Sequence, residues 1–253
     1  MSSLVASKSE GCCCAHHSCK ALVGPSVLDC DKANFLGECN RILDAGADYI
    51  HLDVMDGHFV PAISFGPATI VNLRSHLPNT FFDCHMMVTH PENHIEAVSK
   101  ANNCAAAPLL TQYTFHIEST EPRGKTEEVI AKIKANGMRV GIALSPATPI
   151  DQVLRYTDAV DMVLVMTVVP GKGGQSFIES MMPKVRRVRE LYPLLDIEVD
   201  GGVKPGSTAE SAAKAGANMI VSGSGVFKAP DMQAAIAALR NAVLAFGNGK
   251  SIV

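Results

Sequence analysis

The chain has 253 residues, of which 47% are hydrophobic and 19% charged, a composition typical of a globular protein with a sizeable core. Its formal net charge of −3, without any basic run, gives no electrostatic support for nucleic-acid or membrane-surface binding. No apolar run approaches the roughly 20 residues that span a bilayer, and the first residues do not resemble a signal peptide. We therefore expect a cytoplasmic protein with neither nucleic-acid nor membrane partners.

Residues 1–20 form a head rich in serine and cysteine. It carries four of the eight cysteines and two adjacent histidines: Cys12, Cys13, Cys14, Cys19, His16 and His17. A metal or redox site is one interpretation, but adjacent cysteines do not match the spacing of structural zinc sites. We favour a flexible extension, followed by one domain at 21–247 and a tail at 248–253. The remaining cysteines are scattered and are typical of reduced thiols.

Eight short apolar runs alternate with amphipathic segments along the rest of the chain. The runs cover residues 21–28, 49–55, 81–88, 112–119, 139–145, 162–168, 196–202 and 218–225. Near-continuous apolar runs are typical of strands in a parallel sheet that is covered on both faces.

Helix candidates lie between these runs. They cover residues 31–46, 90–101, 124–137, 181–193, 204–217 and 230–246, with weaker candidates between the second and third runs and at 148–161. Eight strand–helix units in about 225 residues predict an α/β protein with a single (β/α)8 barrel of the TIM type. An open doubly wound sheet is the alternative, but its dinucleotide-binding form needs G-x-G-x-x-G where this chain reads PSVLDCD.

Polar residues interrupt the carboxyl ends of the apolar runs. They are Ser26 in the first run, His51 and Asp53 in the second, His85 in the third and Asp200 in the seventh. In a barrel these ends meet at one mouth, and residues two apart on a strand share a face. Mixed nitrogen and oxygen ligands suit Zn²⁺, Fe²⁺, Mn²⁺ or Co²⁺ better than Ca²⁺ or Mg²⁺. We predict one such divalent ion per subunit, whose charge offsets the cost of burying carboxylates.

A lone histidine in an apolar strand is more often a satisfied core residue than a ligand. We interpret His116 in this way, as a structural residue or one that supports the ligands.

Glycine-rich loops follow the sixth and eighth runs, at 170–177 and 222–227, and Gly201-Gly202 follows the seventh. Consecutive glycines allow backbone N–H groups to converge on an anion, and a helix N-terminus favours negative charge. Any single pair could be only a tight turn. Three such loops at one barrel mouth predict a phosphate site.

Four methionines, Met55, Met86, Met87 and Met166, lie near the same strand ends. Core filling is the default interpretation, and strand alternation allows only some of them to face inward. The alternative is a ring of polarizable, uncharged side chains around an electron-rich intermediate.

These parts favour one kind of chemistry. A divalent metal can hold the two oxygens of an α-hydroxyketone and act as a Lewis acid. Carboxylates above and below the resulting enediolate could remove a proton from one face and return one to the other, which inverts configuration. Asp53 and Asp200 are the candidates, each alternating as base and acid, while the phosphate site fixes the far end of the substrate.

Six motifs occur in order along the chain: HLDVMDGHFVP, DCHMMVTHPE, QYTFHIES, LVMTVVPGKGGQSF, IEVDGGVKP and NMIVSGSGVF. Through these motifs the chain resembles the ribulose-phosphate 3-epimerase family from about Leu22 to about Phe246. The resemblance implies interconversion of D-ribulose 5-phosphate and D-xylulose 5-phosphate in the pentose phosphate pathway, and a homo-oligomer. It implies the metal ligands His51, Asp53, His85 and Asp200, with Asp53 and Asp200 also catalytic. The implied substrate contacts are Ser26, Met55, His85, Met87, Met166, Gly171, Lys172, Gly173, Gly174, Asp200, Gly201, Gly202, Gly223 and Ser224.

The chain departs from the family pattern at several positions. Ala62 stands where the family has asparagine, Lys172 replaces an aromatic residue, Val169 replaces an acidic one, and residues 102–111 resemble an insertion. We expect Lys172 either to add charge near the phosphate or to point into solvent.

Three other functions stay open at this point. One is the same epimerisation on a ketohexose 6-phosphate, because the groups at carbons 2 and 3 are identical. A second is a non-catalytic protein that binds a phosphate ligand, which the two carboxylates and two histidines disfavour. A third is a barrel decarboxylase or isomerase, which needs a catalytic lysine or another acidic pattern that the second strand lacks.

Overall fold

The computed structural model describes residues 19–103 and 109–246. Eight parallel strands form one sheet in the order β1-β8-β7-β6-β5-β4-β3-β2. The strands are β1 (Leu22–Gly24), β2 (Tyr49–Met55), β3 (Phe81–Met87), β4 (Thr111–His116), β5 (Arg139–Leu144), β6 (Met162–Met166), β7 (Asp196–Asp200) and β8 (Met219–Val221). A parallel bridge between Ser26 and His51 joins the chain just after β1 to β2, so the sheet nearly closes on itself. The single (β/α)8 barrel is confirmed.

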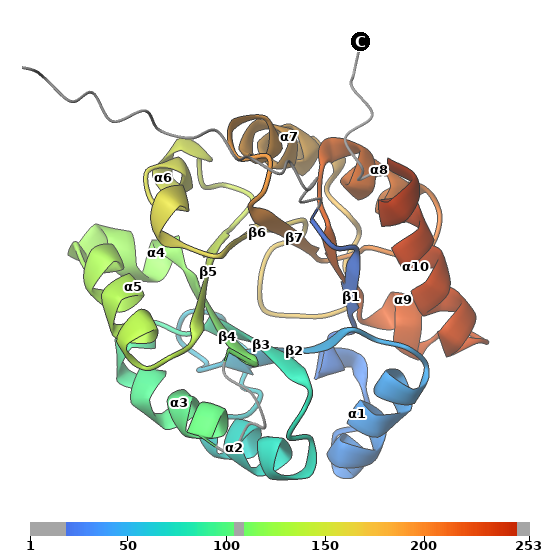
Figure 1. Cartoon of the computed structure of the whole chain (residues 1–253), viewed down its shortest axis with the longest axis horizontal. Coiled ribbons are helices and arrows are strands. Elements are labelled where there is room, and N and C mark those ends of the chain that lie inside the picture. The colour runs from blue at the N-terminus through green and yellow to red at the C-terminus, as the bar shows by residue number, and fades with distance from the viewer. Residues whose placement is uncertain (1–18, 104–108, 247–253) are drawn as a thin grey trace, which may run out of the picture.

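Helices surround this ring of strands on the outside (Figure 1). They are α1 (Phe35–Asp44), α2 (Pro67–His76), α3 (Ile95–Asn103), α4 (Ile117–Thr120), α5 (Thr126–Ala135), α6 (Asp151–Leu154), α7 (Met182–Leu191), α8 (Ser207–Ala215), α9 (Ser224–Phe227) and α10 (Met232–Phe246). Each of the six strong helix candidates overlaps a helix, as predicted; α3 begins later than its candidate at 90–101 and extends two residues beyond it. The weak candidate at 148–161 forms only the four residues of α6 and a short 3-10 turn at Thr157–Ala159.

The first and last strands are shorter than predicted. Proline has no N–H to donate to a sheet, and β1 ends just before Pro25. The Ser26 hydroxyl then accepts a hydrogen bond from the Leu28 N–H and starts a 3-10 turn, so Ser26 follows the strand rather than lying within it. At the other end, β8 stops at Val221 because the chain turns into α9 at Ser224.

Two apolar layers hold the barrel together. On β6, alternate residues Met162, Leu164 and Met166 belong to one buried cluster, while Val163 and Val165 belong to the larger one that contains the helices. The period of two along a strand produces this division. The smaller cluster therefore fills the barrel interior, and it supports the side chains at the mouth.

Several predictions fall partly or wholly outside the described residues: most of the 1–20 head, the 248–253 tail and residues 104–108 of the 102–111 segment. Within the described ranges, Cys19, Cys30, Cys39 and Cys84 are free thiols. No helix in these ranges is long and apolar enough to cross a membrane.

Candidate active site and metal centre

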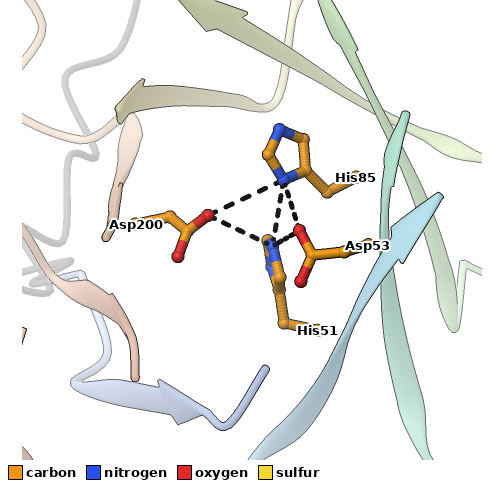
Figure 2. Close-up of side chains that lie close together, drawn as sticks. All are labelled: His51, Asp53, His85 and Asp200. Carbon is orange, nitrogen blue, oxygen red and sulfur yellow. Dashed lines mark hydrogen bonds and ion pairs between the residues drawn. The ribbon is translucent and has the colours of Figure 1, made fainter. Parts of the chain in front are cut away.

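The four predicted ligand residues converge at the mouth of the barrel (Figure 2). His51 and Asp53 lie on one face of β2, and strand register places His85 of β3 beside Asp53. Asp200, the last residue of β7, reaches the same point from the opposite side. One ligand atom from each of the four residues lies within 4.8 Å of the other three.

The spacing of these atoms fits a divalent cation. Asp53 Oδ1 lies 3.4 Å from His51 Nε2 and 3.0 Å from His85 Nδ1, and Asp200 Oδ2 lies 3.7 Å from each nitrogen. The two nitrogens are 3.2 Å apart. Ligands in a tetrahedral site with bonds of about 2.1 Å lie about 3.4 Å from one another. Two imidazole nitrogens and two carboxylate oxygens therefore have both the chemistry and the separation that such an ion requires.

The two carboxyl groups are in different electrostatic environments. Burial opposes ionisation of Asp53, but charge interactions and hydrogen bonds with His51 and His85 hold its pKa well below the usual range. Burial raises the pKa of Asp200 to about 7, with repulsion from Asp53 and Asp83 adding to the effect of burial and His51 opposing it. The pKa values of Asp53 and Asp200 are thus shifted in opposite directions, as expected of two carboxyl groups packed around the same histidines.

Ser26 fixes one oxygen of Asp53. Its hydroxyl lies 2.5 Å from Asp53 Oδ2 and donates to it, while Asp53 Oδ1 faces the two histidines. The Asp53 side chain therefore has one oxygen held by protein and the other in the ligand cluster.

A second buried cluster lies behind His51. His51 Nδ1 is 2.8 Å from Asp83 Oδ2 and 3.8 Å from Glu198 Oε1. The Tyr49 hydroxyl donates to Glu198 Oε1 at 2.5 Å. Burial, together with the negative charge of Asp83, raises the pKa of Glu198 well above its ordinary value. These side chains form a polar layer inside the barrel, directly under the mouth.

A pocket opens above the ligand cluster and encloses about 510 Å³ of space, part of it open to solvent. Its walls include every predicted substrate contact except His85: Ser26, Met55, Met87, Met166, Gly171, Lys172, Gly173, Gly174, Asp200, Gly201, Gly202, Gly223 and Ser224. His85 is fully buried, as is His51. The three glycine-bearing loops and the candidate ligands therefore border one pocket.

The glycine loops require glycine at specific points. Gly202 has a φ of +69°, and a methyl group there would lie 2.4 Å from the Phe177 backbone nitrogen. A residue with a side chain would be strained at this φ and would collide with the facing loop. The side-chain amide of Gln175 donates to the carbonyl oxygens of Val169 (2.6 Å) and Lys172 (2.9 Å), which braces the loop after β6.

Asp29 is a pocket residue that the sequence analysis missed. A methyl group on Gly173 would lie 2.5 Å from Asp29 Oδ1, and one on Gly223 would lie 2.4 Å from Asp29 Oδ2. The carboxylate is therefore inserted between two of the loops that we predicted to bind phosphate. No motif signals this position, because it depends on the turn that the chain makes after Ser26.

The methionines divide as strand alternation requires. Met86 packs in the cluster between strands and helices, whereas Met55, Met87 and Met166 border the pocket. Among the departures from the family pattern, Ala62 packs against the small cluster of Met55, Val60 and Met87. Val169 is 62% exposed, and Lys172 lies on the exposed rim of the pocket.

Three further polar residues were missed or left aside: Asp83, Glu198 and Glu118. Asp83 precedes His85 by two residues and Glu198 precedes Asp200 by two, the same spacing that identified His51 and Asp53. That rule could have found both. Glu118 follows His116 by two residues and forms an ion pair of 3.1 Å with it. It lies in α4, beyond the end of β4, so strand alternation does not predict this contact.

Solved structures show the same fold at low sequence identity. A tryptophan synthase alpha chain from Legionella pneumophila superposes with a TM-score of 0.62 at 13% identity, covering 90% of this chain and 94% of that one. A 3-hexulose-6-phosphate synthase superposes with a TM-score of 0.61 at 18% identity, covering 88% and 99% of the two chains. These similarities support the barrel architecture alone.

Sequence relatives are much closer. The cytoplasmic isoform of ribulose-phosphate 3-epimerase from Oryza sativa is 47% identical over 226 residues, 88% of this chain and 94% of the relative. Ribulose-phosphate 3-epimerase from Schizosaccharomyces pombe is 44% identical over 227 residues, 89% of this chain and 95% of the relative. The family model described as the ribulose-phosphate 3 epimerase family matches residues 22–227. The chain therefore belongs to the ribulose-phosphate 3-epimerase family.

Proposed function

We propose that this protein is a metal-dependent epimerase that interconverts D-ribulose 5-phosphate and D-xylulose 5-phosphate in the pentose phosphate pathway. The observation that carries the proposal is the meeting of Asp53, Asp200 and two histidines at one end of a pocket whose other walls are the glycine loops. Family membership supports the same reaction. We also propose a cytoplasmic location, since the rice relative carries that description; a homo-oligomer stays a prediction.

His51, Asp53, His85 and Asp200 would hold the metal. A bound divalent ion would supply Lewis-acid stabilisation of the negative charge that develops on the substrate oxygens. Asp53 and Asp200 approach from opposite sides, so one carboxylate can remove the proton at carbon 3 while the other delivers a proton to the opposite face. Configuration at carbon 3 then inverts, and the roles of the two residues exchange in the reverse direction.

The remaining pocket residues would position the substrate for this transfer. The loops that contain Gly171, Gly201 and Gly223 would bind the phosphate end through backbone N–H groups. Met55, Met87 and Met166 would surround the reacting carbons with apolar, polarizable side chains that exclude water. Anchoring of the far end keeps carbon 3 within reach of both carboxylates.

Elemental analysis of the purified protein, paired with an epimerase assay before and after chelation, tests this proposal. We expect about one equivalent of divalent metal per chain, loss of turnover on chelation, and recovery when Zn²⁺, Mn²⁺, Co²⁺ or Fe²⁺ is returned. Full activity in protein shown to be metal-free would contradict the metal dependence. A matched comparison of kcat/KM for the ketopentose 5-phosphate and a ketohexose 6-phosphate tests the substrate, and a preference for the hexose would contradict the assignment.

A further inference from the structure

His85 has polar partners on both sides of its ring, and both are buried. Its Nδ1 faces the ligand cluster, 3.0 Å from Asp53 Oδ1. Its Nε2 lies 2.8 Å from Nε2 of His116, at the end of β4. Both imidazoles are fully buried, and their ring planes are inclined by 27° with the centroids 5.0 Å apart. His116 therefore contacts the rear of a candidate metal ligand rather than filling the core as an isolated side chain.

The chain of contacts continues to a carboxylate. His116 Nδ1 lies 3.1 Å from Glu118 Oε2. The other oxygen, Glu118 Oε1, accepts hydrogen bonds from the Ser145 N–H at 2.7 Å and from the Thr148 hydroxyl. These bonds come from the segment after β5, so Glu118 is anchored independently of the histidines and can hold His116 in a fixed position.

Only one arrangement of hydrogens satisfies all these contacts when His85 is a metal ligand. A nitrogen that binds a metal must present its lone pair, so the single hydrogen of a neutral His85 lies on Nε2. That N–H donates to His116 Nε2, which must then accept. The hydrogen of His116 is consequently on Nδ1 and donates to Glu118 Oε2. Glu118 thus determines, through His116, which nitrogen of His85 faces the metal.

His51 is held from behind in a comparable way, but directly. Its Nδ1 lies 2.8 Å from Asp83 Oδ2, and Asp83 Oδ1 accepts from Gln112 at 2.9 Å and from Thr114 at 2.5 Å. Both candidate histidine ligands therefore have an anchored carboxylate on the side away from the metal. Such partners fix ring orientation, and their loss typically costs 10–100-fold in metal affinity.

We propose that His116 and Glu118 form a positioning relay that presents Nδ1 of His85 to the metal. The relay rests on the metal dependence proposed above. It predicts that neither residue touches the ion, yet that both determine how tightly the ion is bound.

The test measures Co²⁺ affinity by competition with a chromophoric chelator, together with the visible absorption spectrum of the Co²⁺-loaded protein. His116→Phe removes the acceptor but keeps an aromatic ring, and we expect it to weaken Co²⁺ binding by about 10–100-fold and to alter the spectrum. His116→Gln offers a carbonyl oxygen to His85 and an N–H to Glu118, so it should recover part of the affinity. His90→Phe, at an exposed histidine paired with Glu92, is the control and should bind Co²⁺ as the wild type does.

Glu118→Gln is the second variant, in case His116→Phe does not fold. It keeps the shape of the side chain but weakens the acceptor for His116, and we expect affinity to fall several-fold. Wild-type Co²⁺ affinity in a folded His116→Phe or Glu118→Gln protein would overturn the relay alone. A wild-type protein that binds no divalent ion would instead contradict the metal dependence itself.

Discussion

Asp53 and Asp200 point toward one another across the mouth of the barrel, and an oxygen of each lies within 3.7 Å of the same nitrogen, His85 Nδ1 (Figure 2). They come from β2 and β7, which are not neighbours in the sheet. Two carboxylates on the same or adjacent strands would approach a substrate from one side. In the mechanism proposed above, this separation around the barrel would place the two carboxylates on opposite faces of a planar intermediate.

Replacement of either carboxylate tests its role in proton transfer. General acid–base catalysis contributes about 10²–10⁴-fold, so Asp53→Asn and Asp200→Asn should each lower kcat by at least about 100-fold. Asp200→Asn should spare the fold better, because its side chain is 14% exposed, whereas Asp53 is buried and bonded to Ser26. Steady-state assays with circular dichroism provide the check. Asp158→Asn, at an exposed carboxylate, is the matched control, and near-normal turnover in either site variant would remove that residue from the mechanism.

Lys172 and Asp29 should affect substrate affinity in opposite directions. Both border the proposed phosphate site, where a cation attracts and an anion repels a phosphate dianion. Lys172→Ala should raise KM by about three- to tenfold, and Asp29→Asn should lower it by a comparable factor, with kcat nearly unchanged. Both effects should shrink at high ionic strength because salt screens exposed charges. Shifts of KM in the same direction for both variants would rule out this electrostatic explanation.

The Asp56 carboxylate joins the loop after β2 to the chain just after β3 through a hydrogen bond from the Thr89 N–H, and the strength of this link depends on the ionisation of Asp56. Burial would raise its pKa, but backbone N–H groups of Thr89, His58 and Phe59, each 2.8 Å away, lower the pKa to about 2. An unfolded aspartate titrates near pH 4. The stability that Asp56 contributes is therefore complete above about pH 4 and is lost as the pH falls toward 2.

Asp56→Asn removes this titration. We expect the variant to be about 1 kcal/mol less stable than the wild type at pH 7, because the amide nitrogen cannot accept from Thr89. The difference should narrow as the pH falls from 4 to 2, as followed by urea unfolding. A difference that is constant over this range would mean that the charge of Asp56 does not contribute.

The sequence predicts the barrel well where a strand is buried on both faces and poorly where a turn decides its end. Residues 49–55 were predicted as a strand and form β2 with the same bounds, since that apolar run has no competing turn signal inside it. The first predicted strand, 21–28, was too long because its apolar residues continue through Pro25 into a 3-10 turn. Apolar character alone does not distinguish these two outcomes.

In the candidate site, too, residues identified by local spacing were predicted, whereas contacts that depend on long-range packing were not. His51 and Asp53 follow from spacing within one strand. The contact between His85 and His116 depends on the register of β3 against β4, in which Met86 pairs with Phe115, and register is a property of the whole sheet. The position of Asp29 between two glycine loops likewise depends on how three distant segments pack.

The most direct test of the central claim is epimerisation of D-ribulose 5-phosphate in D₂O, with deuterium at carbon 3 followed by mass spectrometry or NMR at early times. If two carboxylates act on opposite faces, the first D-xylulose 5-phosphate formed will carry solvent deuterium at carbon 3, while the remaining substrate stays largely protiated. Product that retains the original hydrogen at carbon 3 would contradict proton transfer by two separate groups.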